Sequence, residues 1–209
     1  EDVGFVSEDG TFGPRKPSME MHLANSVILN EKIYQDQPNN YAGWWYCCIP
    51  RTKLSLERLA LPLFIRGDDV EFSIANHAKF ITMNGICIWH MGFVTKFNMP
   101  MEFYQVHRNS LIIQATSDVT PDVDYVERIK NIFDKELGRY NYVGCDLLLD
   151  AIEDFLKGPE FIMKPEGEMI MKKQAARVQP LVDVRQNFPK IKVDYNDIYQ
   201  FYKGKIFSE

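Results

Sequence analysis

The strongest pattern of apolar and polar positions lies in the middle of the chain. An apolar run at residues 61–66 ends in a Gly-Asp-Asp turn, an amphipathic stretch follows at residues 70–78, and a second apolar run covers residues 81–89. Short apolar runs bounded by turn residues are typical of buried strands, and apolar spacing of three and four is typical of a helix. The pattern therefore predicts a strand, a turn, a helix and a second strand.

The remaining segments predict a chain that changes character near residue 116. We expect a loop or a weak hairpin between residues 4 and 13, and helices at residues 19–34, 101–115, 120–137 and 143–156. An aromatic strand is predicted at residues 41–50 and a short helix at residues 195–202. The predicted fold class is α/β, with a mixed sheet in residues 1–115 and a mainly helical region in residues 116–209.

Composition and charge narrow the class of protein. The 209 residues are 45% hydrophobic, enough for a substantial core, and the net charge of -5 argues against a nucleic-acid partner. The four cysteines show no C-x-x-C spacing, so we expect a reducing cytoplasm. No run of 18 apolar residues predicts a membrane span, and the opening EDVGFVSEDG does not look like a signal peptide. It looks like the start of an excised piece.

Candidate chemistry follows the two predicted central strands. Asp68 and Asp69 come after the first strand, where the exposed amides of a helix N-terminus favour ionised carboxylates, and one of them is expected to cap the helix while the other faces the crevice beyond the sheet. His90 comes after the second strand and is expected to reach the same crevice. An acid and an imidazole there suit metal ligation or acid–base chemistry. Two plainer alternatives stay open, namely a simple helix cap and a structural histidine.

Two adjacent tryptophans, Trp44 and Trp45, lie in the aromatic segment. Neighbouring residues on a strand face opposite sides, so one indole is expected to pack and the other is a candidate sugar platform. The alternative is that both indoles are buried between sheet and helices.

These motifs together carry a resemblance to a known family. The segments YAGWWYCCIP, LPLFIRGDDVEFSIA and GICIWHMGF present WW, DD and WH in that order. They resemble family 2 glycosyltransferases of the galactofuranosyltransferase-like group over about residues 40 to 110. The resemblance implies that residues 1–115 form the acceptor-side, C-terminal half of a GT-A catalytic domain, and that residues 116–209 form a helical C-terminal region.

The resemblance also implies an inverting transfer of a sugar and roles for particular residues. Asp69 looks like the catalytic base and Asp68 its neighbour in the acidic motif; Trp44, Trp45 and Glu71 are implied to bind the acceptor. His90 is the implied metal ligand, and Mn²⁺ suits an imidazole better than Mg²⁺. The family's D-x-D metal motif has no match before the tryptophans.

One local D-x-D exists, at Asp122 and Asp124, but Thr-Pro precedes it and a helix is predicted after it. We therefore expect the start of a helix there rather than a metal site. The YQVHRN segment resembles a stretch behind the family's active site, either as structural support or as a phosphate contact. The helix after the acidic motif lacks the basic residue that family members often carry.

The implied partners are a UDP- or dTDP-linked sugar and a glycan or lipid-linked acceptor in bacterial cell-envelope polysaccharide synthesis. Galactofuranose and rhamnose transfer both remain open. We expect a cytoplasmic protein in peripheral contact with the inner face of the membrane, and a homo-oligomer. Two other functions compete: a metal-dependent hydrolase using Asp68, Asp69 and His90, and a non-catalytic glycan-binding or assembly module.

Overall fold

The computed structural model describes residues 3–14, 19–33, 39–83, 85–89, 97–117 and 123–179. The chain up to Val178 forms one compact unit, so the change of character expected near residue 116 falls inside that unit. None of the helices in the described ranges is long and apolar enough to cross a bilayer.

The N-terminal elements form a small antiparallel sheet. Strands β1 (Gly4–Val6) and β2 (Phe12–Pro14) make the expected hairpin, and β3 (Asn40–Tyr41) pairs with the other side of β1, in the order β2-β1-β3. The turn of the hairpin is held by Asp9, whose carboxylate accepts hydrogen bonds from Ser7 and Thr11. These bonds, the one from Ser7 first, lower the pKa of Asp9 to about 2.

Helices make up most of the remaining described chain. Their bounds are α1 (Ala24–Ile33), α2 (Asp68–Ala75), α3 (Val106–Thr116), α4 (Tyr125–Gly138), α5 (Tyr142–Leu156), α6 (Pro159–Ile162) and α7 (Gly167–Ala175). A 3₁₀ turn covers Arg51–Lys53, and a π-helical segment, Pro100–Gln105, runs directly into α3. Every helix predicted in the described ranges is present, with its ends shifted by a few residues; the helix predicted at residues 195–202 lies outside the described residues.

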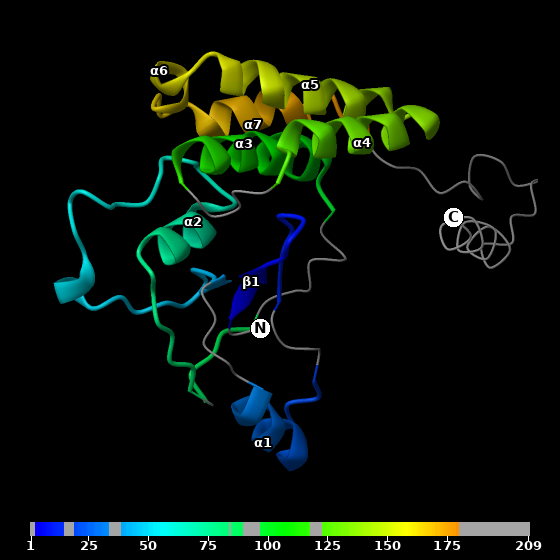
Figure 1. Ribbon diagram of the computed structural model, residues 1–209. Coiled ribbons are helices and arrows are strands. Elements are labelled where there is room, and N and C mark those ends of the chain that lie inside the picture. Colours follow the sequence, from blue (N-terminus) through cyan, green and yellow to red (C-terminus); the bar gives the residue numbers. More distant parts are fainter. Residues whose placement is uncertain are drawn as a thin grey trace, which may run out of the picture. The chain divides into compact units, whose positions relative to one another are not determined.

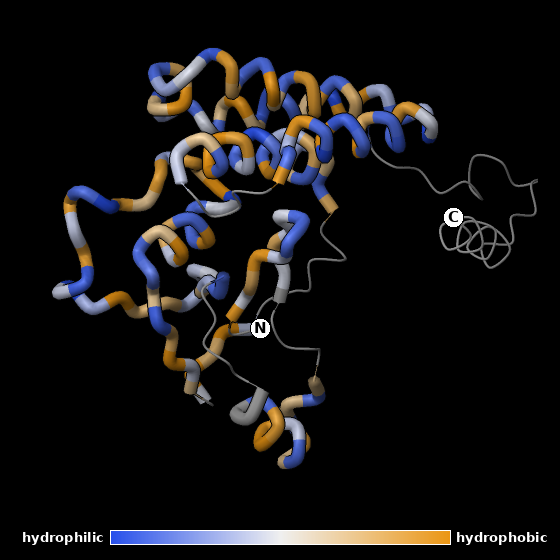
Figure 2. The backbone as a smooth tube through the Cα atoms, viewed as in Figure 1, coloured by the Kyte–Doolittle hydropathy of each residue, from blue (hydrophilic) through white to orange (hydrophobic). Residues whose placement is uncertain are grey.

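The core is built where α3, α4 and α5 meet. Figure 1 shows these helices side by side with α7, and Figure 2 shows hydrophobic and hydrophilic residues alternating along them. Leu111 of α3, Ile129 of α4 and Leu148 of α5 pack in one buried cluster. Helices on both sides of residue 116 therefore share a core.

The N-terminal hairpin also contacts the helices beyond residue 116. The hydroxyl of Tyr125 donates a hydrogen bond to the carbonyl of Gly10, and the guanidinium of Arg128 donates to Thr11 Oγ1 at 3.0 Å. Gly10 has a φ of +76°, and a Cβ there would lie 2.4 Å from the Tyr125 hydroxyl oxygen. Only glycine fits this close contact between hairpin and helix.

The predicted strands at residues 41–50, 61–66 and 81–89 were wrong. Beyond β3, these segments are turns and irregular backbone in the described residues, and Ile81 and Trp89 are each about nine-tenths exposed. Residues 61–66 have their carbonyls bound by side chains of α3 and the segment before it instead of by a neighbouring strand. The mixed sheet expected from these strands is not found in the described residues, where the sheet is small and antiparallel.

A buried histidine makes the stability of this core depend on pH. His107 of α3 is 6% exposed, and its Nδ1 has no hydrogen-bond partner among the described residues. Burial, with a smaller contribution from the charge of Arg128, lowers its pKa from 6.5 to about 4. Between pH 6.5 and about pH 4, the histidine binds a proton in the unfolded chain but not in the folded chain. Acidification therefore favours unfolding.

We therefore expect His107 to lower the free energy of unfolding by about 2 kcal/mol at pH 5 relative to pH 7. The measurement is chemical denaturation of the wild type and of His107→Gln across pH 5 to 7. The difference in slope between the two proteins isolates His107 from the other titrating groups. Equal slopes would contradict the assignment.

Candidate functional site

The site is organised by the N-terminus of α2. Its N-cap is Gly67, with a φ of +89°, and no side chain caps the helix; Asp68 and Asp69 occupy the first turn. The prediction that Asp68 or Asp69 caps this helix was therefore wrong, because the cap residue lies one or two positions earlier. A Cβ at position 67 would lie 2.9 Å from Cδ1 of Ile113, and the left-handed backbone there favours glycine. Glycine at the cap sets the point from which both carboxylates project.

Asp69 is a half-buried carboxylate with a raised pKa. Burial is the first cause and the neighbouring charge of Asp68 the second; hydrogen bonds from the backbone N–H groups of Val70 and Trp44 act in the opposite direction. Its Oδ1 accepts from Val70 N at 2.8 Å. We expected the helix N-terminus to favour the ionised carboxylate and so to lower its pKa. That expectation was wrong for Asp69, because the loss of hydration on burial raises the pKa by more than the backbone amides lower it. A raised pKa makes the carboxylate a stronger base.

Trp44 is brought beside this carboxylate, and neither Trp44 nor its neighbour Trp45 is enclosed. They are 36% and 47% exposed. The ring of Trp44 packs edge-on against Phe72 of α2, with centroids 5.3 Å apart, while its backbone bonds Asp69. Both residues lie in a turn rather than a strand, so the argument from alternating strand faces does not apply. The alternative in which both indoles are buried is excluded.

Cys47, three residues after Trp44, is a neighbour of Asp69 that the sequence did not single out. Burial, then the charges of Cys48 and Asp69, raise the pKa of its thiol. No spacing rule would have found it, because the turn that contains the tryptophans brings it near the acid.

Glu71 lies away from Asp69. Two residues along a helix correspond to a rotation of about 200°, so the two carboxylates point to different sides of α2. Glu71 is 7% exposed; burial raises its pKa, and the charge of Arg58 opposes this. The structure therefore does not group Glu71 with the tryptophans.

Glu71 lines a separate hollow of about 550 Å³. Its wall also includes Arg58, whose Nη1 donates to the carbonyl of Ala75 at 2.7 Å, and the hydroxyl-bearing Thr116 and Ser117. A basic side chain thus reaches the C-terminal end of α2 from the preceding loop. The sequence analysis noted that this helix lacks a basic residue, but it did not consider basic residues outside the helix.

The metal ligand expected from the sequence, His90, lies outside the described residues. Within them, no group of three or more His, Cys, Asp or Glu side chains is placed to hold a metal ion. The described residues alone do not form a complete metal centre.

The local D-x-D behaves as predicted at the residue that is described. Oδ1 of Asp124 accepts from Glu127 N at 2.9 Å and caps α4. Asp122 lies outside the described residues. Asp124 is a helix cap.

The YQVHRN segment is structural support rather than a phosphate contact. Gln105, Arg108 and Asn109 are 0%, 4% and 1% exposed, and all three donate hydrogen bonds to carbonyls of the loop before α2. The sequence left both roles open, because it does not show that this helix packs under that loop.

The chain is similar to two curated enzymes. It is 32% identical over 146 residues to galactofuranosyltransferase GlfT2 of Mycobacterium tuberculosis, an alignment covering 66% of this chain and 22% of that protein. It is 32% identical over 137 residues to galactofuranosyltransferase GlfT2 of Mycolicibacterium smegmatis, covering 64% and 21%. The chain spans about a fifth of the length of these relatives. No family model and no solved structure matches it.

The similarity relates the chain to glycosyltransferases and supports a glycosyltransferase-like role. Both relatives are named as galactofuranosyltransferases, which agrees with the resemblance found in the sequence motifs.

Proposed function

We propose that this chain supplies the acidic turn and the acceptor side of an inverting glycosyltransferase of the GT-A type. The observation that carries the proposal is Asp69, a half-buried carboxylate with a raised pKa, in contact with the turn that exposes Trp44 and Trp45. Similarity to two galactofuranosyltransferases supports the same class. The proposed donor is a UDP- or dTDP-linked sugar, with galactofuranose first because of the relatives' names.

In the proposed reaction Asp69 is the general base. It removes the proton from an acceptor hydroxyl while the oxygen of that hydroxyl bonds to the anomeric carbon of the donor sugar. The bond from that carbon to the nucleoside diphosphate breaks with its electron pair on the phosphate oxygen. The step inverts the anomeric centre. A raised pKa suits the base, because a more basic carboxylate holds the proton better.

Asp68 is proposed to tune this base. Its charge is the second cause of the raised pKa of Asp69, so an ionised Asp68 makes Asp69 a better proton acceptor. It acts through its neighbour and needs no contact with the sugar.

The tryptophans are proposed to hold the acceptor. An indole presents a flat apolar face to the C–H face of a sugar ring and an N–H that donates to hydroxyls. Packing of Trp44 on Phe72 fixes one ring relative to α2, which carries the base.

Mn²⁺ is the proposed cofactor, in preference to Mg²⁺, with His90 as a protein ligand. When bound, it would neutralise the leaving diphosphate. This part of the proposal is argued from the motif and the chemistry of imidazole ligands.

The test is transfer by the complete protein from a panel of UDP- and dTDP-linked sugars to glycan and lipid-linked acceptors, with Mn²⁺, Mg²⁺ or a chelator. We expect transfer from one donor, release of one nucleoside diphosphate per product, and an inverted anomeric configuration by NMR. Retention of configuration, or no transfer from any donor, would overturn the proposal. Glycan binding without nucleotide binding would favour the glycan-binding module.

Glu71 is proposed to bind hydroxyls of a more distant sugar of the acceptor, because the hollow that it shares with Arg58 lies on a different side of α2 from Asp69. We expect Glu71→Gln to raise the KM for the acceptor about tenfold and to change kcat less than about threefold, because a lost hydrogen bond to a bound hydroxyl costs about 1.4 kcal/mol of binding. Steady-state kinetics with varied acceptor measures this. As a control, Glu168→Gln on the exposed start of α7 should change neither constant. An equal fall in kcat and kcat/KM would instead place Glu71 in the chemical step.

A further inference from the structure

The loop that leads into α2 has an unusual backbone. Phe64 and Arg66 have φ angles of 70° and 74°, and Gly67 has 89°. Residues with a side chain rarely adopt the left-handed region, and they persist there only when the surroundings hold them. Residues 64–67 immediately precede Asp68 and Asp69, so whatever holds this loop also sets the direction of the acidic turn.

The loop is held by side chains of Gln105 and Asn109. Asn109 Nδ2 donates to the carbonyls of Arg66 at 2.7 Å and Ile65 at 2.8 Å. Gln105 Nε2 donates to the carbonyl of Leu63 at 2.7 Å. In an ordinary strand these carbonyls would bond to a neighbouring strand.

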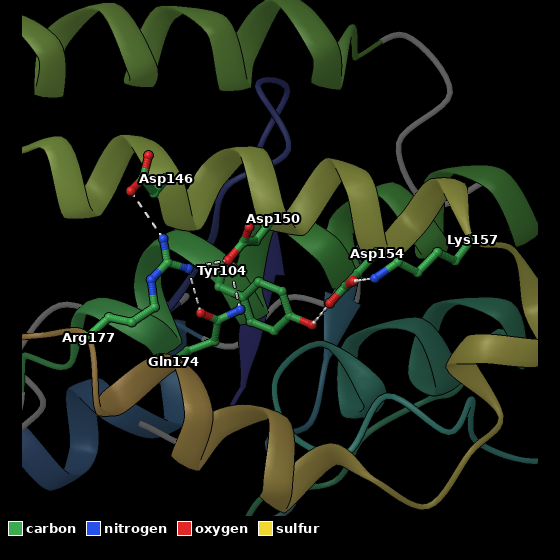
Figure 3. A network of polar contacts seen from close by, with 7 residues as sticks. All are labelled: Tyr104, Asp146, Asp150, Asp154, Lys157, Gln174 and Arg177. Atoms are coloured by element: carbon green, nitrogen blue, oxygen red, sulfur yellow. Dashed lines mark hydrogen bonds and ion pairs between the residues drawn. The ribbon is translucent and has the colours of Figure 1, made fainter.

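The donors are rigid because they are buried and braced. Arg108 donates to the carbonyl of Leu63 and to Asn109 Oδ1, and its Nη1 lies 3.2 Å from the hydroxyl of Tyr104. That hydroxyl donates to Asp154 of α5 at 2.5 Å, and Lys157 pairs with the same carboxylate (Figure 3). A continuous set of polar contacts therefore runs from α5 to the loop.

The same helix α5 is fixed from its other end. Asp150 and Asp146, one and two turns before Asp154 on the same face, both pair with Arg177, and Gln174 of α7 donates to Asp150 (Figure 3). Three aspartates spaced by four residues thus attach α5 to its neighbours. The support beneath the loop is a packed helical layer.

We propose that Asn109, braced by Gln105 and Arg108, is a positioning residue that fixes residues 63–67 and thereby aims the acidic turn of α2. The proposal rests on the proposed function in one respect only, which is that Asp69 acts as the base. Asn109 touches no substrate in this scheme. The amide suits the task because one –NH₂ group serves two adjacent carbonyls of a bent loop, a geometry that a single-donor side chain does not reproduce.

The test compares Asn109→Ala with Ser110→Ala in the complete protein. Ser110 is the adjacent residue, is 4% exposed, and its hydroxyl donates back to Val106 O of its own helix. We expect Asn109→Ala to lower kcat by a factor of about 10 to 100 with KM for the donor within about threefold, because a misaimed base slows the chemical step more than binding. Ser110→Ala should stay within about twofold in both. Assays are run well below each unfolding midpoint.

Hydrogen exchange separates this proposal from the proposed function. In Asn109→Ala, amides of residues 67–72 should exchange at least tenfold faster than in the wild type, while those of α5 should not. If the wild type transfers no sugar but this exchange pattern appears, positioning stands and the enzyme assignment fails. Unchanged exchange at residues 67–72, or a kcat within threefold of wild type, would overturn positioning.

A second variant, which loses fewer hydrogen bonds, keeps the proposal testable if Asn109→Ala does not fold. Gln105→Ala removes one of the donors to Leu63 and a longer bond to Ile65, and it leaves the bonds from Asn109 to Ile65 and Arg66. We expect a smaller fall in kcat, about threefold to tenfold, and faster exchange limited to the start of the loop. A larger effect than that of Asn109→Ala would assign the main role to Gln105 and overturn the proposal for Asn109.

Discussion

Replacement of Asp69 by asparagine is expected to lower kcat by a factor of about 10² to 10⁴ and to leave the fold intact, because a positioned general base contributes about that much. Asparagine keeps an oxygen that accepts from Val70 N and from the backbone of Trp44. It loses only the ability to take a proton. The measurement is kcat of the complete protein with saturating donor and acceptor.

The same substitution should not reduce stability at neutral pH. The pKa of Asp69 is raised in the folded protein, so ionising it costs more there than in the unfolded chain, and stability falls as pH rises above its ordinary range near 3.8. A neutral amide removes that cost and the repulsion by Asp68. We expect the thermal midpoint of Asp69→Asn at pH 7 to equal or exceed that of the wild type. Loss of activity with gain of stability distinguishes a base from a structural acid.

Asp124→Asn is the matched control. Asparagine caps a helix as well as aspartate does, so α4 should keep its N-terminal hydrogen bond to Glu127. Turnover within twofold of wild type is expected. Wild-type turnover in Asp69→Asn would remove Asp69 from the role of base, whereas a large loss in Asp124→Asn would restore the local D-x-D as a functional motif.

Leu148→Ala is expected to destabilise the whole unit by about 3 kcal/mol. Leu148 is fully buried in α5, and it packs with Leu111 from before residue 116 and Ile129 from after it. Removing its side chain loses apolar burial and leaves a cavity in a cluster that both regions share. Urea denaturation followed by circular dichroism gives the change in the free energy of unfolding.

The neighbouring Leu149→Ala is the control, because Leu149 is 47% exposed and its truncation should cost less than about 0.5 kcal/mol. A single unfolding transition in Leu148→Ala, shifted as a whole, is expected from the shared core. Two separated transitions would instead support two independent domains divided near residue 116.

Local signals in the sequence were sufficient for helices and for the acidic turn. The apolar periodicity predicted helices at residues 120–137 and 143–156, and the structure has α4 at Tyr125–Gly138 and α5 at Tyr142–Leu156. Hairpin and turn residues specified β1 and β2. Such features act within a few residues, so a single sequence contains all that decides them.

Apolar runs misled the prediction at residues 61–66 and 81–89. A strand is specified by its neighbours, and an apolar run shows only that a segment is suited to burial. At residues 61–66 the carbonyls accept hydrogen bonds from Gln105 and Asn109, about 40 residues later in the chain. Two residues of this segment also have left-handed backbone angles, which are not those of a strand. The sequence of residues 61–66 does not indicate which distant side chains will bind its carbonyls.

By itself, the sequence determined the helices, the presence of an acidic pair at the start of α2, and the glycosyltransferase resemblance carried by the WW, DD and WH motifs. Only the tertiary structure decided that Asp69 has a raised pKa beside Trp44, that Glu71 faces a different hollow, and that Asn109 supports the loop that precedes α2. Burial, hydrogen bonds between distant segments and the distances between charges all depend on which segments pack together. Packing, and not spacing along the chain, decides this.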